Sequence, residues 1–190
     1  KSFEADSIRD NRAKLLQETF SSGETYFGQY DGYAKGSLIG STTETFFRAK
    51  LKIENERWKG VPFYLEHGKA LPDSFSEITV YFKQGGEVQV PNNVKFKIQP
   101  TSEICVSLNT LEASITETKE MRQDLCFPLQ SEESGSLYPY EKLLSDAFSG
   151  DQTLFVSSKE VKEEWRIVGD IRKNTLGNLL VYKKGEKIEL

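Results

Sequence analysis

The sequence predicts an α+β fold built on an antiparallel β-sheet with one covered face. Segments of alternating polarity fill the middle of the chain, and segments with helical spacing follow them towards the carboxyl end. Several strands joined by short connections favour antiparallel pairing, in which one face of the sheet packs and the other meets water. Helices that come as a group after the strands are typical of the α+β class.

The composition indicates one globular domain over residues 1–190, or a large fragment of one. Of the 190 residues, 37% are hydrophobic and 12% aromatic, which is enough to build a core. The formal charge of -4 gives no basic excess, so we expect no nucleic-acid partner. We also expect no membrane span, because no apolar run approaches roughly 18 residues. The chain begins without Met and soon enters a helical pattern, which suggests a cut inside a longer protein.

The first predicted element is a helix. It begins near Asp6 or Ser7, because either side chain can cap the free backbone N–H groups of a first turn. Ile8 and Leu15 lie along one side of this helix. The stretch 21–37 that follows is rich in Gly and Tyr, and this glycine density predicts a loop.

Strands are predicted next. From Thr45 the side chains alternate in polarity, which places apolar and polar groups on opposite faces of one strand. Similar alternation at residues 78–82, 94–98 and 104–108 predicts further strands. In the clearest strand, the apolar set is Phe47, Ala49, Leu51 and Ile53, and the polar set is Arg48, Lys50, Lys52 and Glu54.

Two helices are predicted near the carboxyl end. Apolar side chains between Leu143 and Phe148 have helical spacing, and Gly150 can take the left-handed conformation that closes a helix. The second helix spans about 158–167. The tail from Asn174 is rich in Lys and Gly, so we expect it to pack loosely.

Lys69 is the best chemical clue in the chain. It follows Gly68 at the end of a predicted strand, where a ligand can approach the backbone closely. Its ammonium group provides three donors and a point charge suited to phosphate. The alternative is a solvated turn lysine, which is the commoner role of a lysine after a glycine.

A second candidate site is the polar face of the strand near residue 97. Lys95, Lys97 and Gln99 are two residues apart, so their side chains point the same way. Together they could hydrogen-bond a sugar. The alternative is an ordinary solvated sheet face.

Other chemistries have less support. His67 is the single histidine, and its place at a strand end is more typical of a residue without a catalytic role. Cys105 and Cys126 belong to no metal-ligand motif, and we expect two unpaired thiols in a reducing compartment. The chain has no G-x-S-x-G elbow, no phosphate loop and no G-x-G-x-x-G turn. We therefore predict no catalytic residue, no metal ligand and no coenzyme site in this chain.

Longer motifs add a more specific signal. Residues 54–63 follow the pattern N-x-R-W-x-G-V-P-F and lead into G-K-A-L at residues 68–71. These segments, together with others between about residues 8 and 168, resemble the carboxy-terminal β+α domain of the glucose-6-phosphate dehydrogenase family. Residues 27–30 resemble the family's R-G-Q-Y, residues 40–46 its S-T-T-E-T-F, and residues 98–100 its R-I-Q-P. The helical segments 140–155 and 164–168 also match the family.

The resemblance implies a large, mainly antiparallel sheet with helices packed on one side. It implies that Lys69 contacts glucose 6-phosphate and that Gln99 lies on the substrate side. The parent enzyme would oxidise glucose 6-phosphate to 6-phosphogluconolactone with NADP, in the cytoplasm, as a homodimer or tetramer that associates through the sheet. In the family, a preceding Rossmann domain binds NADP and carries the histidine base, so we expect this chain alone to be inactive.

The chain departs from the family pattern at several positions. Glu66 and Ser74 replace basic residues that many members place near the motif lysine. Phe75, Lys97 and Cys105 stand where animal members carry residues of a second, structural NADP site, so we expect no structural NADP here. The alternative function is a free-standing, non-catalytic assembly or sugar-phosphate-binding module derived from the same domain.

Overall fold

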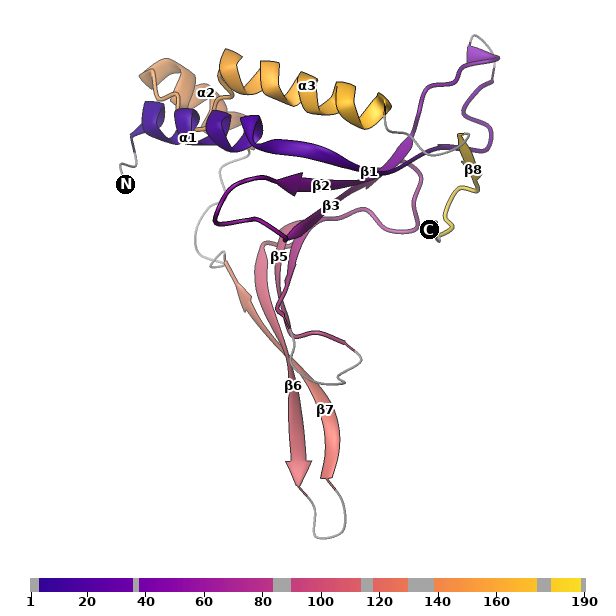
Figure 1. Ribbon diagram of the computed structural model, residues 1–190, viewed down its shortest axis with the longest axis vertical. Coiled ribbons are helices and arrows are strands. Elements are labelled where there is room, and N and C mark those ends of the chain that lie inside the picture. Colours follow the sequence, from indigo (N-terminus) through magenta and orange to yellow (C-terminus); the bar gives the residue numbers. More distant parts are fainter. Residues whose placement is uncertain are drawn as a thin grey trace. The chain divides into compact units, whose positions relative to one another are not determined.

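The computed structural model describes residues 4–35, 38–83, 90–113, 118–129, 139–173 and 179–188. The chain divides into two compact units, which we call unit 1 (residues 1–72 and 137–190) and unit 2 (residues 73–136). Within the described ranges, unit 1 contains helices and one sheet, and unit 2 contains a second sheet (Figure 1). The expected α+β class with mainly antiparallel strands is confirmed, and the strands divide between two four-stranded sheets.

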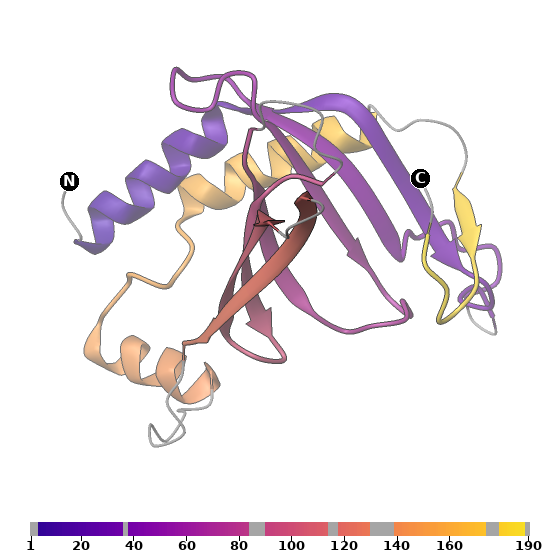
Figure 2. The same ribbon diagram turned by 90° about the horizontal axis from the view of Figure 1, so that it is seen from below.

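Unit 1 packs helices against a sheet with the strand order β3-β2-β1-β8 (Figures 1 and 2). Strand β2 pairs antiparallel with both β1 and β3, whereas β8 runs parallel to β1. The strands are β1 (Thr19–Tyr30), β2 (Phe46–Ile53), β3 (Pro62–Gly68) and β8 (Leu180–Tyr182). The helices are α1 (Ala5–Gln17), α2 (Pro139–Ser149) and α3 (Ser158–Lys173).

The core of unit 1 lies between β2 and α3. Ala49 and Leu51 on β2 pack with Ile167 and Ile171 on α3, and all four side chains are buried. Ile167 and Ile171 are four residues apart, so they lie on the same face of the helix. Beside this core the same elements line an apolar cavity of about 570 Å³. The predicted alternation of β2 is therefore confirmed, with its apolar set towards the helix.

Helix α3 begins with a reciprocal pair of hydrogen bonds. The Ser157 backbone N–H donates to Glu160 Oε2 at 2.7 Å, and the Glu160 N–H donates to Ser157 Oγ at 3.3 Å. This is a capping box, which satisfies two backbone donors that a first turn leaves free. Helix α1 lacks such a bond, because its N-cap residue is Glu4 and its side chain caps nothing. The prediction of a cap at Asp6 or Ser7 is therefore wrong.

Unit 2 is a sheet with the order β4-β5-β6-β7 and purely antiparallel pairing. On one face of the sheet, the register aligns apolar side chains in rows across all four strands. One face carries the apolar rows Ile78-Phe96-Ile104-Phe127 and Val80-Val94-Val106-Leu125, and the other carries Glu77-Lys97-Glu103-Pro128 and Thr79-Lys95-Cys105-Cys126. The strands are β4 (Ser76–Tyr81), β5 (Asn93–Gln99), β6 (Glu103–Ala113) and β7 (Thr118–Pro128).

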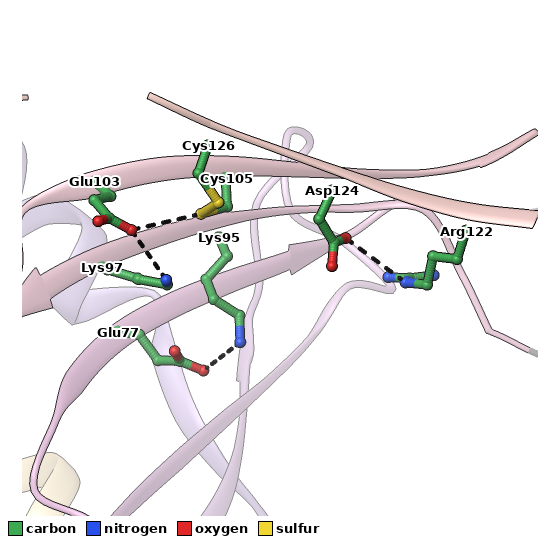
Figure 3. Close-up of a disulfide and its surroundings, with 8 residues drawn as sticks. All are labelled: Glu77, Lys95, Lys97, Glu103, Cys105, Arg122, Asp124 and Cys126. Carbon is green, nitrogen blue, oxygen red and sulfur yellow. Dashed lines mark hydrogen bonds and ion pairs between the residues drawn. A yellow bond between two sulfur atoms is a disulfide. The ribbon is translucent and has the colours of Figure 1, made fainter. Parts of the chain in front are cut away.

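A disulfide joins Cys105 on β6 to Cys126 on β7 (Figure 3). The two residues are directly opposite each other in the register of the two strands. The prediction of two unpaired thiols is wrong, because strand β7 was not predicted. Its polar stretch 119–124 lacks alternation, so the sequence showed no second strand to bring Cys126 beside Cys105.

Three other differences concern loops and helix length. Residues 21–30, predicted as a loop, belong to β1, where the positive φ of Gly23 falls beside an irregularity in the pairing. Helix α3 continues to Lys173, beyond the predicted end. Of the tail, residues 174–178 lie outside the described ranges, whereas 180–182 form β8 and Tyr182 is buried. No helix in the described part of the chain has the length and apolar character that a membrane crossing requires.

Candidate functional site

Lys69 lies in unit 1, directly after the last residue of β3. Its side chain is exposed, and no described residue forms a hydrogen bond or ion pair with its ammonium group. On the neighbouring strand, by contrast, Lys50 is paired with Glu24 and Lys52 with Glu54. Lys69 therefore offers an accessible cation at a strand end, as the sequence predicted.

The backbone at Lys69 is held on both sides. Its N–H donates to the Thr45 carbonyl oxygen at 2.8 Å, and its carbonyl oxygen accepts a hydrogen bond from the Tyr182 hydroxyl at 2.7 Å. Ala70, the next residue, has φ of 54°, in the left-handed region that side chains other than glycine rarely adopt. Its carbonyl oxygen accepts from the Gly185 N–H at 2.8 Å. The chain thus turns sharply at Lys69 and is fixed there by the carboxyl-terminal segment.

Gly68 is required by close packing at this turn. A Cβ atom at residue 68 would lie 2.8 Å from Leu71 Cδ1 and 2.9 Å from Phe46 Cδ2. Real Cβ atoms do not approach other atoms so closely, and Phe46 is almost fully buried. The glycine of the G-K-A-L motif therefore lets the strand end pack against Phe46 with Lys69 exposed beside it.

Two neighbours of Lys69 were singled out in the sequence. Glu66 pairs across the sheet with Arg48, and the Arg48 Nε and Nη2 atoms lie 2.6 and 2.5 Å from Glu66 Oε2. The positive charge of Arg48 offsets the negative charge of Glu66, which would otherwise repel an anion bound at Lys69. The sequence did not predict this ion pair. His67 is exposed, and its ring lies 6.3 Å from the ring of Phe47.

Gln99, the second predicted substrate contact, lies in unit 2 at the end of β5. Its side chain is exposed, and Gln99 pairs with Ser76 in the sheet register. The two lysines on the same face are engaged, since Lys95 Nζ is 3.1 Å from Glu77 and Lys97 Nζ is 3.0 Å from Glu103 (Figure 3). Within unit 2, a ligand would therefore compete with a carboxylate for either lysine.

Glu103, Cys105 and Cys126 place possible metal-ligand atoms within 4.8 Å of one another. The two sulfur atoms are bonded to each other, and a metal binds the thiolate form of cysteine. The Glu103 carboxylate already pairs with Lys97. In the disulfide form this cluster is therefore not a metal site.

Residues 1–188 match the family described as "Glucose-6-phosphate dehydrogenase, C-terminal domain". The chain is 34% identical over 199 residues to a glucose-6-phosphate 1-dehydrogenase of Borreliella burgdorferi, covering 89% of this chain and 41% of that protein. It is 33% identical over 177 residues to "Glucose-6-phosphate 1-dehydrogenase 6, cytoplasmic" of Arabidopsis thaliana, covering 87% of this chain and 34% of that protein.

A solved structure has the same fold. It is a glucose-6-phosphate dehydrogenase in complex with its substrate glucose 6-phosphate, with a TM-score of 0.83 and 25% identity over 99% of this chain and 43% of that one. The class of protein is thus an α+β domain of the kind found in these dehydrogenases, and the chain spans about two fifths or less of the relatives described above. The chain belongs to the glucose-6-phosphate dehydrogenase family, as a carboxy-terminal domain.

Proposed function

We propose that this chain is the substrate-binding and dimerisation part of an NADP-dependent glucose-6-phosphate 1-dehydrogenase. The observation that carries the proposal is the family match combined with Lys69, an exposed cation on a fixed backbone within the G-K-A-L motif. In this role the ammonium of Lys69 orients glucose 6-phosphate while hydride leaves the sugar C1. Gln99 contributes a further polar contact on the substrate side.

Substitution of Lys69 in the enzyme that contains this domain tests the assignment. Lys69→Ala should raise the KM for glucose 6-phosphate by about tenfold to a hundredfold, the range of one hydrogen bond to a charged group. Lys59→Ala, an exposed lysine outside the site, provides the control. An unchanged KM in Lys69→Ala would remove the proposal. Gln99→Ala should raise the KM by less, because it removes an uncharged contact.

NADP would act as the hydride acceptor, bound mainly by another part of the enzyme. The described residues do not fit a dinucleotide site, which needs parallel strands joined through a helix with a glycine-rich turn. In the described sheets, only β1 and β8 are parallel neighbours. The isolated chain should therefore oxidise no glucose 6-phosphate. Measurable turnover by the isolated chain would contradict the proposal that another part of the enzyme binds NADP.

We also propose that the enzyme self-associates through the apolar face of unit 2. Ile78, Phe96 and Phe127 lie in one row across the sheet and are 56%, 39% and 57% exposed. A contiguous exposed apolar surface of this kind is typical of an interface, and a symmetric dimer buries the same patch on both copies. Phe127→Ser should weaken self-association at least tenfold in sedimentation, whereas Asp124→Ser on the polar face should not. A wild-type protein that stays monomeric at high concentration would exclude this interface.

A cytoplasmic location completes the proposal and is supported by the cytoplasmic relative from Arabidopsis thaliana. Reducing systems keep most thiols unpaired in that compartment. The state of Cys105 and Cys126 in intact cells therefore tests the location. Because the structure bonds Cys105 to Cys126, a cytoplasmic location requires the bridge to be mainly reduced in cells and to form in the isolated protein. Rapid thiol trapping before and after lysis should find this, and a fully oxidised pair in cells would argue for another compartment.

A further inference from the structure

Tyr182 connects the carboxyl-terminal strand to the proposed substrate lysine. It lies on β8, 113 residues from Lys69 in the chain, and its hydroxyl is 2.7 Å from the Lys69 carbonyl oxygen. The same hydroxyl lies 2.9 Å from Thr45 Oγ1 and 3.2 Å from the Thr45 carbonyl oxygen. Tyr182 is 7% and Thr45 5% exposed, so water competes little for these hydrogen bonds.

The direction of these hydrogen bonds follows from the groups involved. A carbonyl oxygen can only accept, so the single proton of the Tyr182 hydroxyl is donated to the nearer carbonyl, that of Lys69. The Thr45 hydroxyl then donates to the Tyr182 oxygen, while Thr45 Oγ1 accepts from the Tyr30 N–H at 3.0 Å. A continuous chain of donors therefore runs from β1 through Thr45 and Tyr182 to Lys69.

This chain fixes both peptide groups that flank the Lys69 Cα atom. The preceding peptide is held by the N–H bond to Thr45, and the following peptide by the Tyr182 hydroxyl. With both peptide planes fixed, the direction in which the lysine side chain leaves the backbone is fixed as well. The left-handed turn at Ala70, held by Gly185, keeps the segment from relaxing.

We propose that Tyr182 is a positioning residue for Lys69, an inference that rests on the proposed function of that lysine. A backbone that is already held at Lys69 loses no further conformational freedom when the sugar phosphate binds the ammonium, so binding is stronger. Removal of the hydroxyl leaves the partly buried Lys69 carbonyl without this donor, and the strand end shifts to satisfy it. The aromatic ring keeps its own role, because it packs against Phe46 and Tyr30.

Tyr182→Phe in the full enzyme tests this inference, because it removes the hydroxyl and retains the ring. The KM for glucose 6-phosphate should rise by about twofold to tenfold, the range of one neutral hydrogen bond, with kcat within twofold of the wild type. Tyr33→Phe is the matched control, since Tyr33 belongs to the same aromatic cluster but its hydroxyl forms no hydrogen bond with a described residue. It should leave both constants unchanged.

The double variant Lys69→Ala/Tyr182→Phe separates positioning from a general effect on folding. Without the ammonium its placement no longer matters, so the double variant should have the same KM as Lys69→Ala alone. Additive effects would overturn the inference, as would a Tyr182→Phe enzyme with wild-type KM beside a defective Lys69→Ala enzyme. A wild-type KM in Lys69→Ala would instead remove the proposed function itself, and the inference with it.

Discussion

Unit 1 and unit 2 each contain a four-stranded sheet, yet they bury very different amounts of apolar surface. Of the nine buried hydrophobic residues among those described, eight belong to unit 1 and one, Cys105, to unit 2. Unit 1 covers its sheet with α3, whereas the apolar rows of unit 2 remain exposed or half-buried. Unit 2 instead has a covalent link between neighbouring strands. The comparison indicates that hydrophobic burial stabilises unit 1, and that cross-strand pairs and the disulfide stabilise unit 2.

The largest expected effect comes from a matched pair of isoleucine substitutions. Ile167→Ala removes a buried side chain of unit 1 and should lower its free energy of unfolding by about 2–4 kcal/mol. Ile78→Ala removes a side chain that is 56% exposed in unit 2 and should cost less than about 0.5 kcal/mol. Hydrogen exchange at protein concentrations below self-association measures both values. Equal losses in the two variants would contradict the comparison.

A comparable effect, confined to unit 2, should follow loss of the disulfide. The bridge closes a loop between residues 21 apart in sequence, for which the chain-entropy estimate is about 3 kcal/mol. Replacement of Cys105 and Cys126 by Ser should therefore speed hydrogen exchange in β6 and β7. Exchange in α3 and β2 should not change, and the wild-type protein with a dithiol reductant should behave like the variant. Unchanged exchange in β6 and β7 would show that strand pairing alone holds the sheet.

The two units also differ in how far the sequence predicted them. In unit 1, the alternation around Ala49 and the glycine before Lys69 identified a strand, its buried face and the exposed cation. Each of these features depends on residues that are close together in the sequence, so a local sequence pattern can predict it. Tyr182 was missed because its contact with Lys69 spans 113 residues and the tail has no periodicity. The Cys105–Cys126 bridge was missed for a related reason, since the polar stretch of β7 gave no sign of a strand.

The residues that connect distant parts of unit 1 are thus polar side chains that a local pattern reads as surface. Arg48 and Glu66 are 18 residues apart on different strands, and only the register of β2 with β3 brings them together. Thr45 begins the predicted strand, and only the structure shows that it is buried beside Tyr182 of β8. The alternation of apolar and polar residues therefore predicts which face of a strand is buried. The site depends on contacts between residues far apart in the sequence, and this alternation does not predict them.

The smallest effect concerns pH, and it should be confined to unit 1. Burial alone would raise the pKa of the Glu160 carboxyl, but hydrogen bonds from Ser157 and the charge of Arg12 outweigh it and lower the pKa below 4.5. A carboxyl whose pKa is lower in the folded state stabilises the fold above its unfolded pKa. That contribution is lost as the pH falls from about 4.5 through the folded value.

Glu160→Gln keeps the side-chain length and an acceptor oxygen but does not titrate. It should lower the stability of unit 1 at pH 7 by about 1 kcal/mol, the value of a helix cap, and the difference from wild type should shrink as the pH falls below 4.5. Glu163→Gln on the same helix is the control, because Glu163 caps no helix end and pairs with Arg166. Chemical denaturation between pH 3 and 7 measures the difference. If it persists undiminished as the pH falls, the capping box stabilises α3 through the geometry of its hydrogen bonds and not through its charge.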